Sequence, residues 1–261
     1  MSDGFVQVVC PGCGLLCDDI EVKVENGKIV STLHTCARGE WTLLNANSEF
    51  RLTSPLVKKN GQHVKVSFDE ALDHAAEILS SAERPLLWGW SSTSVEAQRV
   101  GIRLAQLLGG VIDSTSSICH GSSILAGREA GFRTATLGEI KNRADLIIYW
   151  GSDPSHSHPR HLSRYTTIPR GIYTQMGYEQ KQLVVIDVRK TRTGKVANQV
   201  LEIEPNKDYE LISAMRMILK GKNVKEKEVA GIPVKTLNQL IQTWKTQQFG
   251  VIFVGLGLSM S

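Results

Sequence analysis

The stretch DLIIYWGSDP, residues 145–154, decides the fold, because a compact apolar run is followed at once by turn residues. The same pattern occurs in QLVVID at 182–187 and in FGVIFVG at 249–255. Such runs predict strands of a parallel sheet that helices cover on both sides. Amphipathic helices expected at 208–219 and 235–244 would supply part of that cover.

Upstream of these strands the sequence predicts two more helices. Ser67 and Glu70 have the spacing of a capping box, and Thr93 and Glu96 repeat it before the second helix. Between the two helices, PLLWGW at 85–90 predicts a short buried strand. The residues expected to face the core are Ala71, Leu72, Ala75, Ile78 and Leu79 in the first helix and Ala97, Val100, Leu104 and Leu107 in the second.

The N-terminal part of the chain has a different pattern. From about residue 5 to residue 33 apolar and polar residues alternate around Asn26 and Gly27, which predicts a hairpin with an Asn-Gly turn. The pattern changes near residue 55, where we expect a subdomain boundary. The predicted fold is therefore α/β, with a small β-rich cap at 1–55 and a Rossmann-like parallel-sheet region at 56–261.

Composition limits the function classes. The chain has 261 residues, 41% of them hydrophobic, and its formal net charge of +4 is spread among residues of both signs. Without a basic stripe, nucleic acid is not an expected partner. No targeting segment or membrane span is recognisable, so we expect a cytoplasmic protein. In that reducing compartment, closely spaced cysteines more often bind metal or do redox chemistry than form disulfides.

Four of the five cysteines form one set. Cys10, Cys13 and Cys17 have the spacing C-x-x-C-x-x-x-C, and Cys36 follows beyond the hairpin. Three thiolates on one tight loop and a fourth from elsewhere can converge on one centre. Because a second C-x-x-C knuckle is missing, the spacing favours a 4Fe-4S cluster over zinc, and buried thiols are the remaining alternative.

The fifth cysteine, Cys119, stands beside His120 in SSICHGSS, where a loop between a strand and a helix would carry functional side chains. A small buried cysteine next to a hydrogen-bonded histidine is one interpretation. The other is a thiolate ligand for a soft metal with a neighbouring proton carrier.

Two strand ends and a histidine group complete the candidate sites. Small and acidic residues follow the first two strands, where a backbone can approach a phosphate or a ring closely. These residues are Gly151, Ser152, Asp153 and Pro154 in one turn and Asp187, Arg189 and Thr191 in the other. We interpret HSHPRH, residues 156–161, as a solvated or substrate-facing loop, because no acidic or cysteine ligands stand beside it.

Taken together, these features resemble the molybdopterin oxidoreductase superfamily, and more closely the catalytic B subunits of tungsten or molybdenum formylmethanofuran dehydrogenases. The resemblance covers essentially the whole chain. The motifs that carry it are, in chain order, CPGCGLLCDDI, CARGE, RLTSPL, VSFDEAL, ICHG, GSDPSHSHPRH and VVIDVRKTRTGKVAN.

The resemblance implies roles for individual residues. Cys10, Cys13, Cys17 and Cys36 would hold a 4Fe-4S cluster. Cys119 would bind tungsten or molybdenum, which carries two molybdopterin guanine dinucleotides, and His120 would be the active-site acid/base. The residues implied to contact these cofactors are Arg38, Gly121, Gly151, Ser152, Asp153, Pro154, Asp187, Arg189, Asp208, Gly255 and Gly257.

The implied reaction is the reversible reduction of carbon dioxide to formate, with electrons arriving from a ferredoxin-type donor through iron-sulfur clusters. Formate would then condense with methanofuran on an amidohydrolase-like subunit. The other implied partners are a pterin-binding subunit and polyferredoxin-type subunits. We expect the second region to be incomplete at its C-terminal end, because the active-site arginine of the family would lie beyond residue 261.

Three alternatives stay open. One is a non-catalytic assembly subunit of the same complex, although retention of all five cysteines argues against it. Another is a different oxidoreductase of the formate dehydrogenase type. Without the resemblance, the sequence is also compatible with a zinc-containing nucleotide-binding protein.

Overall fold

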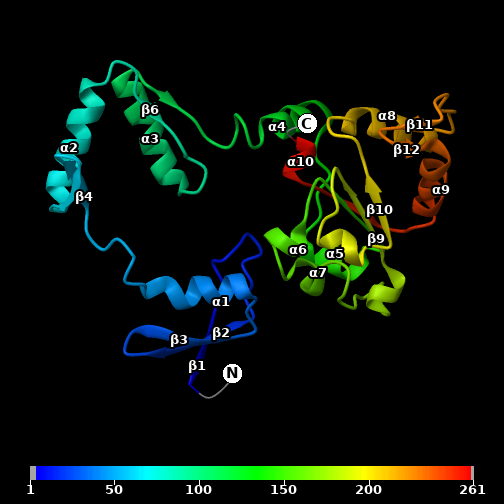
Figure 1. Cartoon of the computed structure of the whole chain (residues 1–261), viewed down its shortest axis with the longest axis horizontal. Helices are drawn as coiled ribbons and strands as arrows, with labels where there is room; N and C mark the ends of the chain where they lie inside the picture. The colour runs from blue at the N-terminus through cyan, green and yellow to red at the C-terminus, as the bar shows by residue number, and fades with distance from the viewer. Residues whose placement is uncertain (1–3, 260–261) are drawn as a thin grey trace. The chain divides into compact units, whose positions relative to one another are not determined.

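A computed structural model describes residues 4–259 of the chain (Figure 1). Its contacts divide the chain into two units. The first combines the residues up to Asn45 with those from Ala130 onward, and the second is Ala46–Glu129. The iron-sulfur subdomain expected at 1–55 stays a prediction, because the units are defined by contacts and not by a bound group.

The first unit begins with an antiparallel sheet of strands β1 (Phe5–Val8), β2 (Ile20–Glu25) and β3 (Lys28–Leu33), in that order. Between β2 and β3, Asn26 and Gly27 have φ angles of +50° and +73°, as a two-residue turn of positive φ requires. The predicted Asn-Gly hairpin is therefore confirmed. Helix α1 (Ala37–Leu44) follows, and a 3-10 turn, η1 (Asn45–Asn47), leads into the second unit.

The centre of the first unit is a parallel sheet with the strand order β10-β9-β8-β13. Its strands are β8 (Leu146–Trp150), β9 (Gln182–Asp187), β10 (Gln199–Glu202) and β13 (Gly250–Val254). All of β8 and nearly all of β9 is buried, which confirms the parallel sheet expected from their apolar runs. The β13 prediction needs correction. As an edge strand it leaves Ile252 and Val254 more than half exposed.

Helices cover both faces of this sheet (Figure 1). Helices α8 (Asp208–Leu219) and α9 (Val234–Lys245) pack on one face and confirm the two helices expected there. Helices α5 (Leu137–Arg143) and α7 (His161–Arg164) contribute to the other face. Short elements complete the unit: α6 (Pro154–Ser157), η2 (Gly177–Gln180), η3 (Thr193–Val196), β11 (Glu228–Val229), β12 (Ile232–Pro233) and α10 (Leu256–Ser259).

The second unit holds two small sheets and two long helices. Its elements are β4 (Leu56–Lys59), β5 (Gln62–Lys65), α2 (Phe68–Ser81), β6 (Leu86–Leu87), α3 (Val95–Leu108) and β7 (Val111–Ile112). Helix α4 (Gly121–Ala130) is the last element of the second unit, which ends at Glu129. The Ser67 side chain accepts a hydrogen bond from the Glu70 amide, which confirms that cap. At α3 the cap is Ser94 rather than Thr93, because the Ser94 hydroxyl accepts from the Ala97 amide.

Burial in this unit differs from expectation. The predicted core face of α2 is uncovered, since no residue of that helix is buried. Helix α3 buries Gly101 and Ala105 rather than Val100 and Leu107, because Trp90 packs directly on Gly101. The strand expected at 85–90 is only two residues long. No helix within residues 4–259 combines the length and the apolar character that a membrane crossing requires.

Candidate functional site

The loop between β1 and β2 carries three of the cysteines and folds back on itself. The Cys10 amide donates to the Cys17 carbonyl at 2.9 Å, and the Leu16 amide donates to the Cys13 carbonyl at 3.2 Å. Leu16 has a φ of +46°, a left-handed conformation that reverses the chain there. These bonds fix the curvature that brings Cys10 and Cys17 together. We call the whole connection between β1 and β2, residues 9–19, the cysteine loop.

The fourth cysteine comes from a helix start. Cys36 is the N-cap of α1, with extended backbone, and its carbonyl accepts from the Glu40 amide at 2.9 Å. The free amides at a helix start can donate hydrogen bonds to a metal-bound sulfur at this position. The placement therefore suits Cys36 to a role as a metal ligand.

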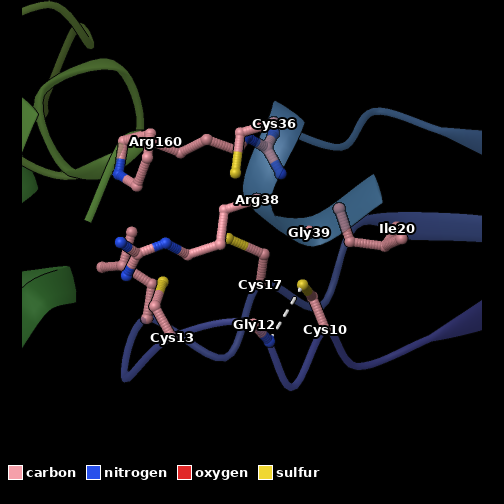
Figure 2. A pocket seen from close by; sticks show the side chains of 11 residues that line it. Cys10, Gly12, Cys13, Cys17, Ile20, Cys36, Arg38, Gly39 and Arg160 are labelled. Carbon is pink, nitrogen blue, oxygen red and sulfur yellow. Dashed lines mark hydrogen bonds between the residues drawn. The ribbon is translucent and has the colours of Figure 1, made fainter. Parts of the chain in front are cut away.

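All four side chains line one cavity between the cysteine loop and α1 (Figure 2). Two glycines allow the approach. A Cβ on Gly39 would lie 2.9 Å from Cys10 Sγ, and a Cβ on Gly12 would lie 3.3 Å from Gly39 Cα. The Gly12 amide also donates to Cys10 Sγ at 3.4 Å. Helix and loop thus form a cradle that a larger residue at either glycine would fill.

Four cysteine side chains on one cavity could bind a group that contains several metal atoms. Among residues 4–259, no three cysteine, histidine or acidic side chains lie close enough together to bind one ion. Zinc would need its thiolates about 2.3 Å from a single atom. Four cysteines around a shared cavity match the four thiolates of a 4Fe-4S cluster, each of which binds its own iron. The residues present therefore fit that group.

Arg38 of α1 also lines this cavity, as do two residues of another segment, Pro159 and Arg160. Nη1 of Arg38 donates to the Ser157 carbonyl at 3.0 Å, which joins α1 to the loop after β8. A Cβ on Gly14 would lie 3.4 Å from Nε2 of His158, so this loop also touches the cysteine loop. The β8–β9 loop, residues 151–181, is thus part of the cysteine site.

The histidines of this loop differ in environment. His156 is exposed and His158 is half-buried, but His161 is only 7% exposed, so the solvated-loop interpretation is wrong for His161. The Tyr149 hydroxyl lies 2.8 Å from Nδ1 of His161 and 2.9 Å from the Thr166 hydroxyl. Burial lowers the pKa of His161 to about 4 and raises the pKa of Tyr149. His161 is therefore a neutral structural residue at neutral pH.

Four charged residues that the sequence did not predict join the cysteine loop to the β8–β9 loop. Arg160 makes two hydrogen bonds to the Asp19 carboxylate, of 2.7 and 2.5 Å. Arg164 donates to Asp18 at 2.8 Å, and its Nη1 lies 2.9 Å from Asp19 Oδ1 as an ion pair without hydrogen-bond alignment. We call these four residues the Arg–Asp clamp. Its signal in the sequence was an Asp pair directly after Cys17 and two arginines four residues apart.

A second group lies at the carboxyl edge of the parallel sheet. Gly151 has a φ of +59°, and a Cβ on Gly255 would overlap the Gly151 carbonyl oxygen. A Cβ on Gly257 would lie 3.1 Å from Gly151 Cα. The chain runs from β8 to β9 and β10 on one side and returns to β13 on the other, so these glycines lie at the point where the strand order reverses. That point is the usual position of a ligand crevice.

Asp153 organises the same edge. Its carboxylate accepts from the Thr193 amide at 3.0 Å, the Thr193 hydroxyl at 2.6 Å and the Arg192 amide at 3.1 Å. Burial opposes ionisation, but these hydrogen bonds outweigh it and lower the Asp153 pKa. The carboxylate thereby ties the turn after β8 to the turn after β9. Ser152 and Pro154 flank it in the same turn.

The remaining predicted residues of the first unit differ in exposure. Asp187, at the end of β9, is buried, and burial raises its pKa although it accepts from the Arg189 amide at 3.2 Å. The Arg189 side chain is exposed. Asp208 is also buried, and its carboxylate accepts from Trp150 Nε1 at 2.6 Å. In this structure Asp208 is thus bonded within the core.

Cys119, His120 and Gly121 lie in the second unit, at the start of α4. Cys119 is half-buried and lines a pocket with Trp88 and Asp113. The exposed His120 donates its backbone amide to the Thr115 carbonyl at 2.7 Å. Cys119 thus lines a pocket, and the exposed His120 follows it directly in the chain without lining that pocket.

Known proteins resemble this chain in sequence and in fold. The family described as molybdopterin oxidoreductase matches residues 51–257. The chain is 44% identical over 259 residues to the B subunit of the tungsten-containing formylmethanofuran dehydrogenase 2 of Methanococcus maripaludis, covering 98% of this chain and 60% of that protein. It therefore spans about three fifths of the length of this relative.

Two solved structures share the fold. Acetylene hydratase from Pelobacter acetylenicus matches 97% of this chain and 40% of its own, with a TM-score of 0.70 and 17% identity. The formyltransferase/hydrolase complex from Methylorubrum extorquens, solved with methylofuran, matches 79% of this chain and 53% of its own, with a TM-score of 0.56 and 21% identity. At these identities the likeness concerns the fold alone.

Proposed function

The chain belongs to the molybdopterin oxidoreductase family, and from that premise we propose that it acts as the catalytic B subunit of a formylmethanofuran dehydrogenase. The proposed reaction is the reversible reduction of carbon dioxide to formate. The observation that carries the proposal is the cavity lined by Cys10, Cys13, Cys17 and Cys36 in a chain 44% identical to such a subunit. That cavity supplies the donor set of an electron relay.

Each group of residues has a proposed role. The four cysteines hold a 4Fe-4S cluster, and Arg38, which lines the same cavity, favours an added electron there through its positive charge. Cys119 provides the thiolate for tungsten or molybdenum, and His120 holds or moves the proton of the reaction. The bound metal with two molybdopterin guanine dinucleotides supplies the two-electron chemistry.

The carboxyl edge of the parallel sheet is the proposed binding surface for the pterin dinucleotides. Gly151, Gly255 and Gly257 let the turns after β8 and β13 pack closely at this edge, and Asp153 and Asp187 offer acceptors at the ends of β8 and β9. Ser152, Pro154, Arg189 and Asp208 complete the proposed set in the first unit, and Gly121 is a separately proposed cofactor contact in the second unit. The partners that we propose are an amidohydrolase-like subunit, a pterin-binding subunit, polyferredoxin-type subunits and a ferredoxin-type donor.

Anaerobic metal analysis of the complex tests this proposal. We expect about four iron atoms on this chain, beyond those of other subunits, together with tungsten or molybdenum. Cys119→Ala should abolish carbon dioxide reduction and lower the tungsten or molybdenum content while the iron stays. An active complex that contains neither metal would contradict the proposal.

A second pair of variants separates catalysis from assembly. His120→Asn should lower kcat strongly with both metals retained, whereas His63→Asn, a change of the same kind at an exposed position of β5, should leave kcat unchanged. If Cys119→Ala and His120→Asn both leave the complex active, the chain is a non-catalytic assembly subunit.

A further inference from the structure

The Arg–Asp clamp is directed toward the cysteine cavity. Arg160 lines that cavity, whereas Asp18 and Asp19 do not. From the position at which it lines the cavity, Arg160 donates two hydrogen bonds to the Asp19 carboxylate, of 2.7 and 2.5 Å. The clamp therefore places the positively charged Arg160 at the cavity, and neither of its aspartates lines the cavity.

The arginine side chains of the clamp are more buried than its aspartate side chains, so water screens their positive charge less. The side chains of Arg160 and Arg164 are 20% and 19% exposed, but those of Asp19 and Asp18 are 41% and 73% exposed. Water screens the carboxylates more than the guanidinium groups, so the opposite charges do not cancel at the cavity. A cluster that gains an electron becomes more negative, and a nearby partly buried cation stabilises that state.

Buried hydrogen bonds fix the β8–β9 loop, which carries both arginines. Tyr149, at the core of the sheet, hydrogen-bonds both His161 and Thr166 within the β8–β9 loop. Nζ of the buried Lys181 donates to the carbonyls of Thr166 at 2.7 Å, Pro169 at 3.0 Å and Lys141 at 3.2 Å. The loop therefore has a fixed interior from which the two guanidinium groups reach the cysteine loop.

We propose that Arg160 and Arg164 are positioning residues that hold the cysteine loop in its cluster-binding conformation, and that the charge of Arg160 raises the reduction potential of the cluster. The inference rests on the proposed function, since it takes the group bound by the cysteines to be an iron-sulfur cluster. Arg160 is thus predicted to tune the last electron relay before the catalytic centre.

The test is an anaerobic redox titration of the full chain in its complex, followed by the electron paramagnetic resonance signal of the reduced cluster. Arg160→Gln should shift the midpoint potential to a more negative value, and Asp19→Asn should shift it to a more positive one. Both variants break the same ion pair, so a purely structural role would shift the two potentials in one direction or in neither. Either of these outcomes overturns the inference.

Arg143→Gln is the matched control, because it also removes an arginine from an ion pair, with Glu139 at 2.9 Å, but away from the cavity. It should leave the potential unchanged. Arg160→Lys keeps the charge but loses the two-point contact, so its potential should lie nearer to that of the wild type than the potential of Arg160→Gln does.

Hydrogen exchange of the iron-free chain tests positioning independently of the cluster. Residues 10–17 should exchange faster in Arg160→Gln, Asp19→Asn and Arg160→Lys than in the wild type or in Arg143→Gln. Unchanged exchange overturns the positioning role. Absence of any cluster from the wild-type complex would refute the proposed function itself, whereas a wild-type cluster whose potential Arg160→Gln does not change refutes only the inference.

Discussion

At the scale of single residues, the lack of a side chain at Gly39 allows α1 to lie close to the cysteine loop. We predict that Gly39→Ala lowers the iron content and the cluster absorbance, because its Cβ would meet Cys10 Sγ at 2.9 Å and displace that ligand. Alanine is the better helix former by about 1 kcal/mol, so the loss should not come from a failure of α1 to form.

Gly138→Ala provides the control for that substitution. Gly138 also lies in a short helix, α5, but a Cβ there would meet only Thr136 Oγ1, at 4.0 Å. Its iron content should equal that of the wild type. Equal iron in both variants would show that the cradle tolerates a methyl group at Gly39.

The buried His161 makes the stability of the folded chain depend on pH. Its pKa in the folded protein is about 4, against an ordinary value of 6.5, because burial penalises the charged ring. The unfolded chain therefore binds the extra proton first, and stability falls as the pH decreases from about 6.5 to about 4. The upper limit of this contribution is about 3 kcal/mol.

Urea denaturation of His161→Gln at about pH 7, 5 and 4 measures that contribution. The variant should lose less unfolding free energy between the highest and the lowest pH than the wild type does, because glutamine does not titrate. His63→Gln, at an exposed site, should keep the wild-type dependence. If the unfolding free energy falls equally with pH in the wild type, His161→Gln and His63→Gln, another group causes the acid sensitivity.

At the scale of elements, the β8–β9 loop depends on a single buried cation. Lys181 is 1% exposed, and burial lowers its pKa, but three backbone carbonyls accept its hydrogen bonds. We predict that Lys181→Met lowers the free energy of unfolding by about 3 kcal/mol, because these buried carbonyls lose their donor.

Thermal and urea denaturation would measure this loss, with Lys220→Met at an exposed site as the control. The control should stay within about 0.5 kcal/mol of the wild type. If Lys181→Met is equally stable, the carbonyls find other donors and the loop is not fixed by this cation.

The same elements show what a sequence can predict. The strands at 146–150 and 182–187 and the helix at 208–219 followed from local apolar patterns, and their bounds agree closely with the structure. The Arg–Asp clamp did not, because Arg160 and Asp19 are 141 positions apart, and no local periodicity records such a pairing. The cysteine set was recognisable because its chemistry requires close spacing.

At the scale of the whole molecule, the two units have unequal cores. Five residues of α8 are buried, including Leu211, but no residue of α2 is, although its apolar side chains were expected to face a core. The periodicity of α2 correctly predicts an amphipathic helix, but it does not reveal what covers the apolar face. Which residues cover that face depends on the packing partner, and the sequence of α2 does not specify its partner.

This inequality predicts how the chain opens. In hydrogen exchange of the isolated chain, amides of α2 should exchange much faster than those of α8, because local opening of α2 exposes little buried surface.

A matched pair of substitutions tests the same point. Leu211→Ala should cost about 2–5 kcal/mol because Leu211 is fully buried, whereas Leu72→Ala should cost less than about 1 kcal/mol at 53% exposure. Equal protection of both helices, or equal costs, would mean that the apolar face of α2 is covered in solution.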